Sequence, residues 1–478
     1  MIQKILPDGK TATAFPISIP QQFMYFMSAQ YGAKSPVNNI GMGYFIDGEI
    51  DFNIMKESLY EAISRCDTMR LRFTKDETYK ILQYVTEESE MEIEEWDLSH
   101  MPFSEAKAQL HKVSREEIPT YDCEIHKIAL IKFENGRNGI FLKLHHFAMD
   151  AYSVGVFIRD TIEIYLHKTE GKAYPKPMKP YIPVLLKELS YINSPEKAAD
   201  KEYWYRSLAD TSEPVFTDYM LNNRLSEQRK TYPDRRFADI HSGSPEADTL
   251  IFSMSSEDSQ KILNACNKRE LSVCAFISAG LRTALSVFNN NEEDVSFKMI
   301  VNRRGSIAEK KSGGIRINFF PMRSIISPDM SFADMVNNIS AIQNEIYSHC
   351  SLSFMDMLIE RHKYMPKDAK PDSTYDSIGL SYQPLTDFPE IPGCKVSSTW
   401  FNNGASMIPL YLTVKHRTSD KGLDFIFEYR KEPDPSYDLK IFYKKLSGAL
   451  IMGAENPDTK TGTILSELQI TDEERNRN

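Results

Sequence analysis

Two adjacent histidines and an aspartate offer the clearest chemistry in this sequence. His145, His146 and Asp150 stand in the stretch HHFAMD, at the end of an apolar run. Histidine carries a proton that can move near neutral pH, so an imidazole held at a strand end can take a proton from an attacking amine, hydroxyl or thiol. The aspartate can steady that site by pairing with an arginine, or it can simply cap the next helix. Histidines at strand ends are more often structural than catalytic. By itself, the pattern therefore indicates only a candidate site.

The residues on either side predict the elements that position these side chains. Two apolar runs, 128–133 and 140–144, flank the turn sequence ENGRNG. This arrangement predicts a β-hairpin whose second strand ends at the histidines. Residues 153–168 have helical spacing and are followed by Gly171, which predicts a helix that begins after Asp150.

Helix-like and strand-like segments alternate along the whole chain, which predicts an α/β fold. Helices are predicted over 18–30, 51–67, 434–456 and, as a pair, 259–288. Strands are predicted over 39–51, 69–73, 295–304, 315–326, 375–383, 409–417 and 423–431.

Length and composition exclude several classes of protein. The 478 residues exceed what one hydrophobic core usually spans, so we expect two lobes. The net charge of -10 argues against nucleic acid as a partner, because phosphate binding needs a basic face. The six cysteines show no metal-ligand spacing and fit a reducing compartment. No signal peptide or membrane-spanning run is evident, so we expect a cytoplasmic protein with no bound metal.

The histidine motif resembles that of a known family. HHFAMDAYS is similar to the HHxxxD active-site motif of the condensation domains of nonribosomal peptide synthetases. These domains share a superfamily with chloramphenicol acetyltransferase and other CoA-dependent acyltransferases. The stretch FPISIPQQFMYF resembles their opening segment. Arg65 and Arg70 match their second motif, although Cys66 replaces the usual histidine and Met69 the usual leucine.

Further stretches match the family in the expected order. GGIRINFFPMR carries the family's glycine, asparagine, proline and arginine at Gly314, Asn318, Pro321 and Arg323. SLSFMDML and YDSIGLSYQ match more loosely, with Ser353 in place of proline and Ser381 in place of asparagine. The tail SELQITDEERNRN resembles the linker into an adenylation domain. Each match is weak, but together they cover nearly the whole chain.

The resemblance implies an α/β fold of two chloramphenicol-acetyltransferase-like lobes, arranged as a V-shaped pseudodimer with a tunnel between them. A stretch with four prolines in twelve residues, KAYPKPMKPYIP, indicates the boundary between the lobes. We expect an N-terminal lobe over 1–175, a proline-rich linker over 176–190, a C-terminal lobe over 191–465, and the start of an interdomain linker over 466–478.

The resemblance also implies an activity. Carrier proteins would bring an acyl thioester and an aminoacyl thioester on phosphopantetheine arms, or CoA would carry the donor, with no permanently bound cofactor. The amine would attack the donor carbonyl and form an amide. His146 would be the catalytic residue, as a base, a positioner or an oxyanion stabiliser, and His145 would be structural.

Several supporting residues follow from the same resemblance. Asp150 would be an ion-pair partner of Arg65, Arg70 or Arg303, with Arg65 the first choice. Ala151 stands where the family usually has glycine. It keeps the backbone N–H for an oxyanion role but would be strained at a positive φ. The predicted tunnel-lining residues are Ser153, Asn318, Arg323, Ser381 and Gln383.

The position of the first motif near the start of the chain indicates a starter-type domain. Such a domain joins a fatty acyl group to the first residue of a lipopeptide, a secondary metabolite, and is followed by an adenylation domain. A free-standing condensation enzyme, or one that receives a peptide from another synthetase protein, remains open as well. Two alternatives from other functional classes also remain open at this point. One is a CoA-dependent O- or N-acyltransferase with a small soluble acceptor, and the other is a non-catalytic domain that docks carrier proteins.

Overall fold

The chain forms two compact units, each built from separate stretches of sequence. The computed structural model describes residues 2–5, 9, 11–32, 35–209, 213–240, 244–384 and 389–475. The first unit comprises 1–197, 302–317 and 386–405, and the second comprises 198–301, 318–385 and 406–478. The predicted linker over 466–478 can be followed to Arg475, and its last three residues lie outside the described part of the chain.

The first unit contains a mixed sheet that carries the histidine motif. In the described residues its strand order is β15-β3-β8-β7-β6. The strands are β3 (Asn39–Asp47), β6 (Ile93–Asp97), β7 (His126–Lys132), β8 (Arg137–His145) and β15 (Lys395–Phe401). The central pair is antiparallel and places Asn39 opposite His145, so β3 supports the very end of β8.

The predicted hairpin is present and has the expected turn chemistry. β7 and β8 pair antiparallel, with His126 opposite Leu144. The turn between them is the short helix η3 (Glu134–Gly136), in which Asn135 and Gly136 have φ values of 58° and 70°. Asparagine and glycine tolerate this left-handed conformation better than other residues, which explains why the chain reverses here.

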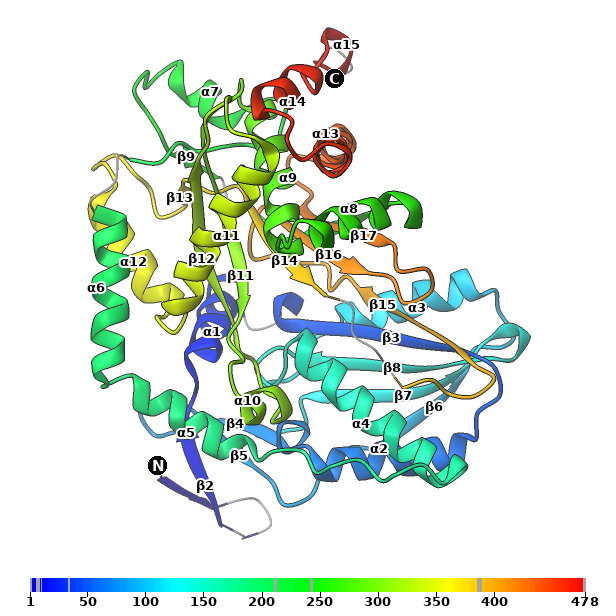
Figure 1. Cartoon of the computed structure of the whole chain (residues 1–478). Coiled ribbons are helices and arrows are strands. Elements are labelled where there is room, and N and C mark those ends of the chain that lie inside the picture. The colour runs from blue at the N-terminus through cyan, green and yellow to red at the C-terminus, as the bar shows by residue number, and fades with distance from the viewer. Residues whose placement is uncertain are drawn as a thin grey trace. The chain divides into compact units, whose positions relative to one another are not determined.

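Helices cover both faces of this sheet. The helices α2 (Phe52–Arg65) and α4 (Ala151–Glu170) run side by side against one face (Figure 1). The helix α3 (Phe103–Arg115) packs on the other face, where Ala106 and Leu110 meet Phe141 and Phe401 of the strands. Because side chains alternate along a strand, successive side chains of β8 pack against the helices on opposite faces of the sheet. The last residue of the strand lies at the edge of the sheet.

A smaller sheet and further helices complete the first unit. The sheet has the strand order β1-β2-β5-β4. Its strands are β1 (Ile2–Ile5), β2 (Thr11–Pro16), β4 (Leu71–Lys75) and β5 (Ile81–Val85). The remaining helices are α1 (Ile19–Tyr31), η1 (Pro36–Asn38), η2 (Asp67–Met69), α5 (Tyr181–Tyr191) and α10 (Ile307–Lys311). The linker expected over 176–190 is thus largely the helix α5, whose Pro183 stands in the first turn, where proline is tolerated.

The second unit is built around a larger mixed sheet. Its strand order in the described residues is β10-β17-β16-β14-β11-β12. The strands are β10 (Ala247–Ser253), β11 (Asp294–Asn302), β12 (Ile317–Ile325), β14 (Ile378–Gln383), β16 (Leu410–His416) and β17 (Leu423–Arg430). A separate short pair joins β9 (Ala238–Asp239) to β13 (Ser373–Thr374).

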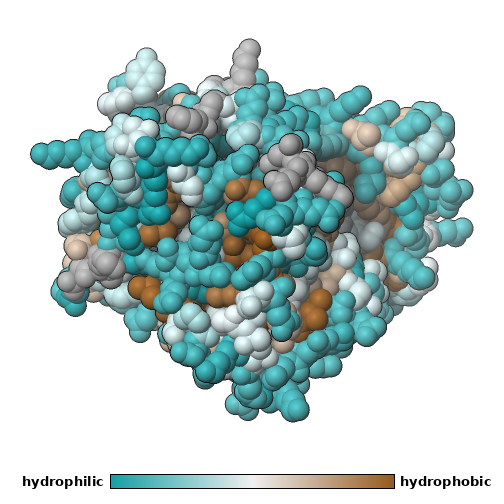
Figure 2. Space-filling view, turned by 90° about the horizontal axis from the view of Figure 1, so that it is seen from above, coloured by the Kyte–Doolittle hydropathy of each residue, from teal (hydrophilic) through white to brown (hydrophobic). Residues whose placement is uncertain are grey.

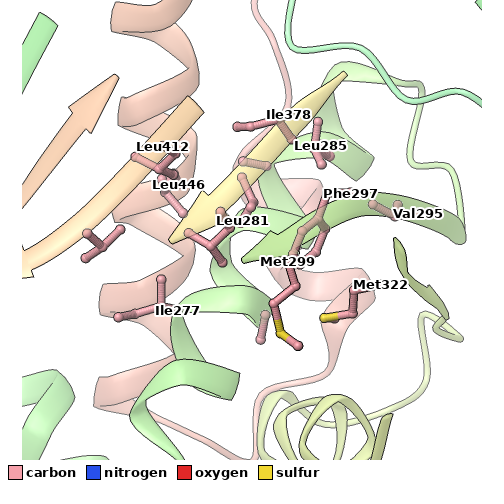
Figure 3. Close-up of a cluster of buried hydrophobic side chains, with 14 of the residues drawn as sticks. Ile277, Leu281, Leu285, Val295, Phe297, Met299, Met322, Ile378, Leu412 and Leu446 are labelled. Atoms are coloured by element: carbon pink, nitrogen blue, oxygen red, sulfur yellow. The ribbon is translucent and has the colours of Figure 1, made fainter. Parts of the chain in front are cut away.

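Helices pack around the larger sheet. The helices that follow residue 194 in the described parts of the second unit are α6 (Pro195–Ala209), α7 (Arg224–Arg229), α8 (Ser256–Lys268), α9 (Val273–Phe288), α11 (Phe332–Ser348), α12 (Phe354–Tyr364), α13 (Ser436–Glu455), α14 (Thr461–Glu467) and α15 (Asp472–Arg475). Of these, α9 and α13 cover the buried apolar face of the sheet. Figure 3 shows Leu281 of α9 and Leu446 of α13 among the core side chains that project from β11, β14 and β16. The alternation of helices and strands in both units confirms the predicted α/β class.

The face of the molecule shown in Figure 2 is mostly hydrophilic, with separate hydrophobic patches. In the part of the chain that the structure describes, no single helix is both long enough and apolar enough to cross a membrane. The helices α8 and α9 meet those criteria only together, and they are bent by 119° relative to each other.

Candidate active site

His146 lies immediately after β8 and is held there through its backbone. Its N–H donates to the carbonyl of Asn38 at 2.7 Å, and the N–H of His145 donates to the carbonyl of Ile125 at 3.0 Å. Between Gly139 and Asp150, only His146 is partly exposed, and every other residue is buried. The fold therefore presents one imidazole from an otherwise closed segment.

The environment of His146 favours the neutral ring. Burial lowers the pKa of His146, and the carboxylate of Asp150 opposes this effect only in part. Nδ1 is enclosed and has no hydrogen-bond partner of regular geometry among the described residues. Nε2 is thus the ring nitrogen that remains accessible to a substrate. A neutral imidazole with an accessible nitrogen can accept a proton or a hydrogen bond from an amine.

His145 has a structural environment. Its Nδ1 accepts the N–H of Phe147 at 3.2 Å, and its Nε2 lies 3.4 Å from the hydroxyl of Thr120. Because Nδ1 accepts a hydrogen bond, the proton of the neutral ring belongs on Nε2. The ring also packs edge-on against Phe147, and burial lowers the pKa of His145 to about 3. These contacts shape the turn that leads from the strand to His146.

Asp150 accepts hydrogen bonds on both carboxylate oxygens. Oδ1 accepts the N–H of Ser153 at 3.0 Å and Nη2 of Arg304 at 2.9 Å. Oδ2 accepts Nη1 of Arg304 at 2.8 Å and the N–H of Arg316 at 2.9 Å. Burial raises the pKa of Asp150, but Arg304 and the backbone donors outweigh it and hold the pKa below its ordinary value. Asp150 is therefore an ionised structural anchor with no oxygen left to act as a base, and it also caps α4.

The ion-pair partner of Asp150 differs from the one predicted. Arg65, the first choice, instead pairs with Asp160 at 2.9 Å. Arg70 pairs with Asp67 and donates to the carbonyl of Glu87, and Arg303 pairs with Glu188. The prediction of an ion pair was correct and the choice of arginine was wrong. Arg65 lies at the C-terminal end of α2, next to the second and third turns of α4, whereas Asp150 precedes that helix.

Arg304 is the residue that sequence reasoning missed. Its side chain is only 1% exposed, and its guanidinium also donates to Ser153 Oγ and to the carbonyl of Gly314, each at 2.7 Å. The segment 302–317, which follows β11 of the second unit, belongs to the first unit and carries both Arg304 and Gly314. The only signal in the sequence was the pair of adjacent arginines in VNRRG.

Two other predicted residues lie at the start of α4. Ala151 is the first residue of the helix and does not have a positive φ, so the strain considered for alanine at this position is absent. As an N-terminal helical residue it has no N–H partner within the helix. Ser153 is buried, and its hydroxyl donates to the carbonyl of Gly314 at 2.6 Å. Ser153 thus joins α4 to the segment 302–317.

The remaining predicted residues belong to the second unit. Asn318 donates to the carbonyl of Leu352 at 2.7 Å. Arg323 forms a two-point ion pair with Asp294, at 2.7 and 2.6 Å. Ser381 and Gln383 lie on β14, opposite Thr413 and Lys415 of β16. A tunnel-lining role for these residues stays a prediction, although the amide of Asn318 and the guanidinium of Arg323 are already engaged in holding β12.

No metal centre can be built from the described residues. No three His, Cys, Asp or Glu side chains among them come together as ligands for an ion.

Comparison with known families identifies the family of this chain. A sequence model described as Condensation domain matches residues 11–473. The chain belongs to the condensation domain family. Condensation domains of nonribosomal peptide synthetases are acyltransferases that form amide bonds, which is the enzyme class that the sequence predicted.

Curated relatives of this condensation domain are much longer proteins. One plipastatin synthase chain of Bacillus subtilis is 22% identical over 427 residues, which are 89% of this chain and 16% of the relative. Surfactin synthase subunit 1 of the same organism is 24% identical over 332 residues, which are 68% of this chain and 9% of the relative. The chain therefore spans less than a fifth of the length of either protein.

Solved condensation domains share the fold. The first condensation domain of the calcium-dependent antibiotic synthetase, in complex with a substrate analogue, has a TM-score of 0.78 at 18% identity, covering 94% of this chain and 98% of that chain. The starter condensation domain of rhizomide synthetase RzmA, a mutant in complex with C8-CoA and Leu-SNAC, has a TM-score of 0.76 at 18% identity, covering 94% and 96%.

Proposed function

We propose that this chain is an amide-forming condensation domain of the starter type. The donor would be a fatty acyl thioester, carried by CoA or by the phosphopantetheine arm of a carrier protein. The acceptor would be the amine of an aminoacyl group on a second carrier protein. The observation that carries the proposal is the neutral, partly exposed imidazole of His146 within an otherwise buried segment of the family motif.

In the proposed reaction, the amine nitrogen attacks the carbonyl carbon of the donor thioester. Nε2 of His146 accepts the hydrogen bond of the amine and takes its proton as the new C–N bond forms. The tetrahedral intermediate then collapses, the C–S bond breaks, and the proton passes to the leaving thiolate. Because an amine and a thioester react readily once held together, positioning by His146 supplies a large part of the rate.

The start of α4 can stabilise the oxyanion of that intermediate. The N–H of Ala151 has no acceptor within its helix, and the positive end of the helix dipole lies at the same place. Asp150 and Arg304 keep this helix end fixed next to the turn of His146. The oxyanion would therefore meet a donor that is already oriented.

One comparison supports a starter-type donor. A solved relative of the same fold is a starter condensation domain in complex with C8-CoA and Leu-SNAC. Carrier proteins, a following adenylation domain and a place in lipopeptide synthesis are parts of the same proposal.

Intact mass spectrometry of the acceptor carrier protein tests the proposal. The protein is mixed with an aminoacyl-loaded carrier protein and, in separate reactions, with octanoyl-CoA, an octanoyl-loaded carrier protein or no donor. We expect a mass gain of one acyl group on the acceptor with at least one donor. If folded protein transfers no octanoyl group to the acceptor from either CoA or the carrier protein, the starter-type proposal is wrong.

Variants separate the alternatives. His146→Ala should lower the rate of transfer about 10²- to 10⁴-fold, the usual contribution of a general base, while His100→Ala, at an exposed histidine of the same unit, should not. Equal rates in both variants, no higher than the rate without the protein, would favour a non-catalytic docking domain. Transfer to a free amine or alcohol, but not to the loaded carrier, would favour a CoA-dependent acyltransferase.

A further inference from the structure

The second unit contains a pocket that the proposed reaction does not use. It has a volume of about 460 Å³, part of it open to solvent, and it lies between α12 and the strands β11 and β12. Its apolar wall comes mainly from Phe354, Met357 and Leu358 of α12, with Pro321 of β12. Pockets that bind small molecules are mostly apolar, with a few placed polar groups, as this one is.

Three titratable side chains form the polar end of the pocket. Nζ of Lys298 on β11 lies 3.7 Å from the carboxylate of Asp376, and Nη1 of Arg361 donates to the same carboxylate at 2.9 Å. The side chain of Asp376 is fully buried and also accepts the hydroxyl of Ser296. Burial lowers the pKa of Lys298. The guanidinium of Arg361, which stays protonated in proteins, is therefore the cation that the pocket offers to a ligand.

Arg361 retains an open donor edge. Only its Nη1 is hydrogen-bonded to a described residue, so Nε and Nη2 have no acceptor in the part of the chain that the structure describes. These two nitrogens form the side of the guanidinium that binds both oxygens of a carboxylate. The face of the guanidinium is meanwhile held by the ring of Tyr375, whose centroid is 4.5 Å away.

We propose that this pocket binds a monocarboxylate with an apolar chain of medium length. The carboxylate would pair with the open edge of Arg361, and the chain would lie against Phe354, Met357 and Leu358. The pocket consists of residues of the second unit alone and does not depend on the proposed condensation activity.

Calorimetric titration of the full chain with octanoate tests this inference. We expect saturable binding of one octanoate, weaker binding of octanol and no binding of octylamine, because an ammonium group would be repelled by the guanidinium of Arg361. Hexanoate should bind more weakly by about fourfold for each methylene removed, if the chain is buried. Absence of saturable octanoate binding, or equal affinity for octylamine, would overturn the proposal.

Two variants on neighbouring positions of α12 locate the site. Leu358→Asp places a negative charge in the pocket and should weaken octanoate binding at least tenfold. Ile359→Asp is the matched control, because Ile359 is 59% exposed and does not line the pocket. Arg361→Gln should weaken binding by a similar tenfold, since it removes a charged hydrogen bond. Equal affinities of the two α12 variants would contradict the assignment.

The reaction site must be distinguished from this pocket. His146→Ala should leave octanoate binding unchanged, and Leu358→Asp should leave acyl transfer to the carrier protein unchanged. A photoreactive octanoate analogue should label peptides of α12. Loss of octanoate binding in His146→Ala, with labelling confined to peptides around residues 145–151, would show that the acid enters the reaction site instead and would overturn the proposal.

Discussion

Arg304 and Asp150 form a two-point ion pair between residues 154 positions apart in the chain. Both side chains are about 1% exposed, so the pair is almost fully removed from water. Burying two charges is costly unless further hydrogen bonds satisfy them, and here Ser153, Gly314 and the N–H of Arg316 do so. The pair therefore fixes the end of the turn that carries His146 and the first residue of α4.

Removing Arg304 should strongly destabilise the first unit. In Arg304→Gln the carboxylate of Asp150 would stay buried without a cation, and we expect the free energy of unfolding to fall by about 3–5 kcal/mol. Chemical denaturation followed by circular dichroism measures this loss. Arg206→Gln is the control, because the pair of Arg206 with Glu202 is exposed and should contribute nothing measurable. Equal stability of the two variants would contradict the anchoring role of Arg304.

The elements next to the histidines could be predicted because local sequence determines them. The turn of the hairpin depends on Asn135 and Gly136, which accept positive φ values. The helix α4 begins at a capping aspartate, Asp150, and ends at Gly171, which adopts the left-handed conformation. Each of these signals acts within a few residues of the element that it controls.

The partner of Asp150 could not be predicted, because it depends on tertiary structure. Arg303 and Arg304 are adjacent and chemically identical, yet Arg303 pairs with Glu188 and Arg304 with Asp150. The local backbone decides which guanidinium faces which carboxylate, and composition does not reveal it. The same limit applies to β15, which was expected in the C-terminal lobe but pairs with β3 of the first unit.

The buried His145 should make stability sensitive to acid. Burial holds its pKa at about 3 in the folded chain, against an ordinary value of 6.5. Below pH 6.5 the unfolded chain binds a proton that the folded chain does not, so the stability present above pH 6.5 is lost as the pH falls toward 3. At pH 5 this loss amounts to about 2 kcal/mol.

The variant His145→Asn should reduce this acid sensitivity. We expect the decrease in Tm between pH 7.5 and pH 5 to be smaller than in the parent, whatever the Tm of the variant at pH 7.5. Part of the decrease will remain, because burial also lowers the pKa of His126, to about 4. His100→Asn, at an exposed position, should leave the pH dependence unchanged. An unaltered pH dependence of Tm in His145→Asn would show that the pKa of His145 is not lowered in the folded chain relative to the unfolded chain.

Phe401 should stabilise the packing of β15, in the segment 386–405, within the first unit. It lies on β15, is 7% exposed, and its ring centroid is 5.7 Å from that of Phe141 on β8. Phe401→Ala should lower the free energy of unfolding by about 3–5 kcal/mol, because a large cavity would open under the sheet. Phe26→Ala, at a position 45% exposed, should cost less than about 1 kcal/mol. Similar losses in both variants would mean that β15 is not packed as described.

Gly314 should tolerate no side chain, for two separable reasons. Its φ is +89°, and an added Cβ would lie 2.8 Å from the ring of Tyr181. Its carbonyl accepts hydrogen bonds from Ser153 and Arg304, so any displacement would disturb the anchor of Asp150. Gly314→Ala should therefore lower both the free energy of unfolding, by about 1–3 kcal/mol, and the rate of acyl transfer.

Gly136→Ala isolates the conformational cost, because Gly136 has a φ of +70° but open space around its Cβ position. We expect that variant to lose about 1 kcal/mol and to keep the parent's transfer rate. If Gly314→Ala retained the parent's rate of acyl transfer and lost no more stability than Gly136→Ala, the segment 302–317 would not be holding the turn of His146 in place.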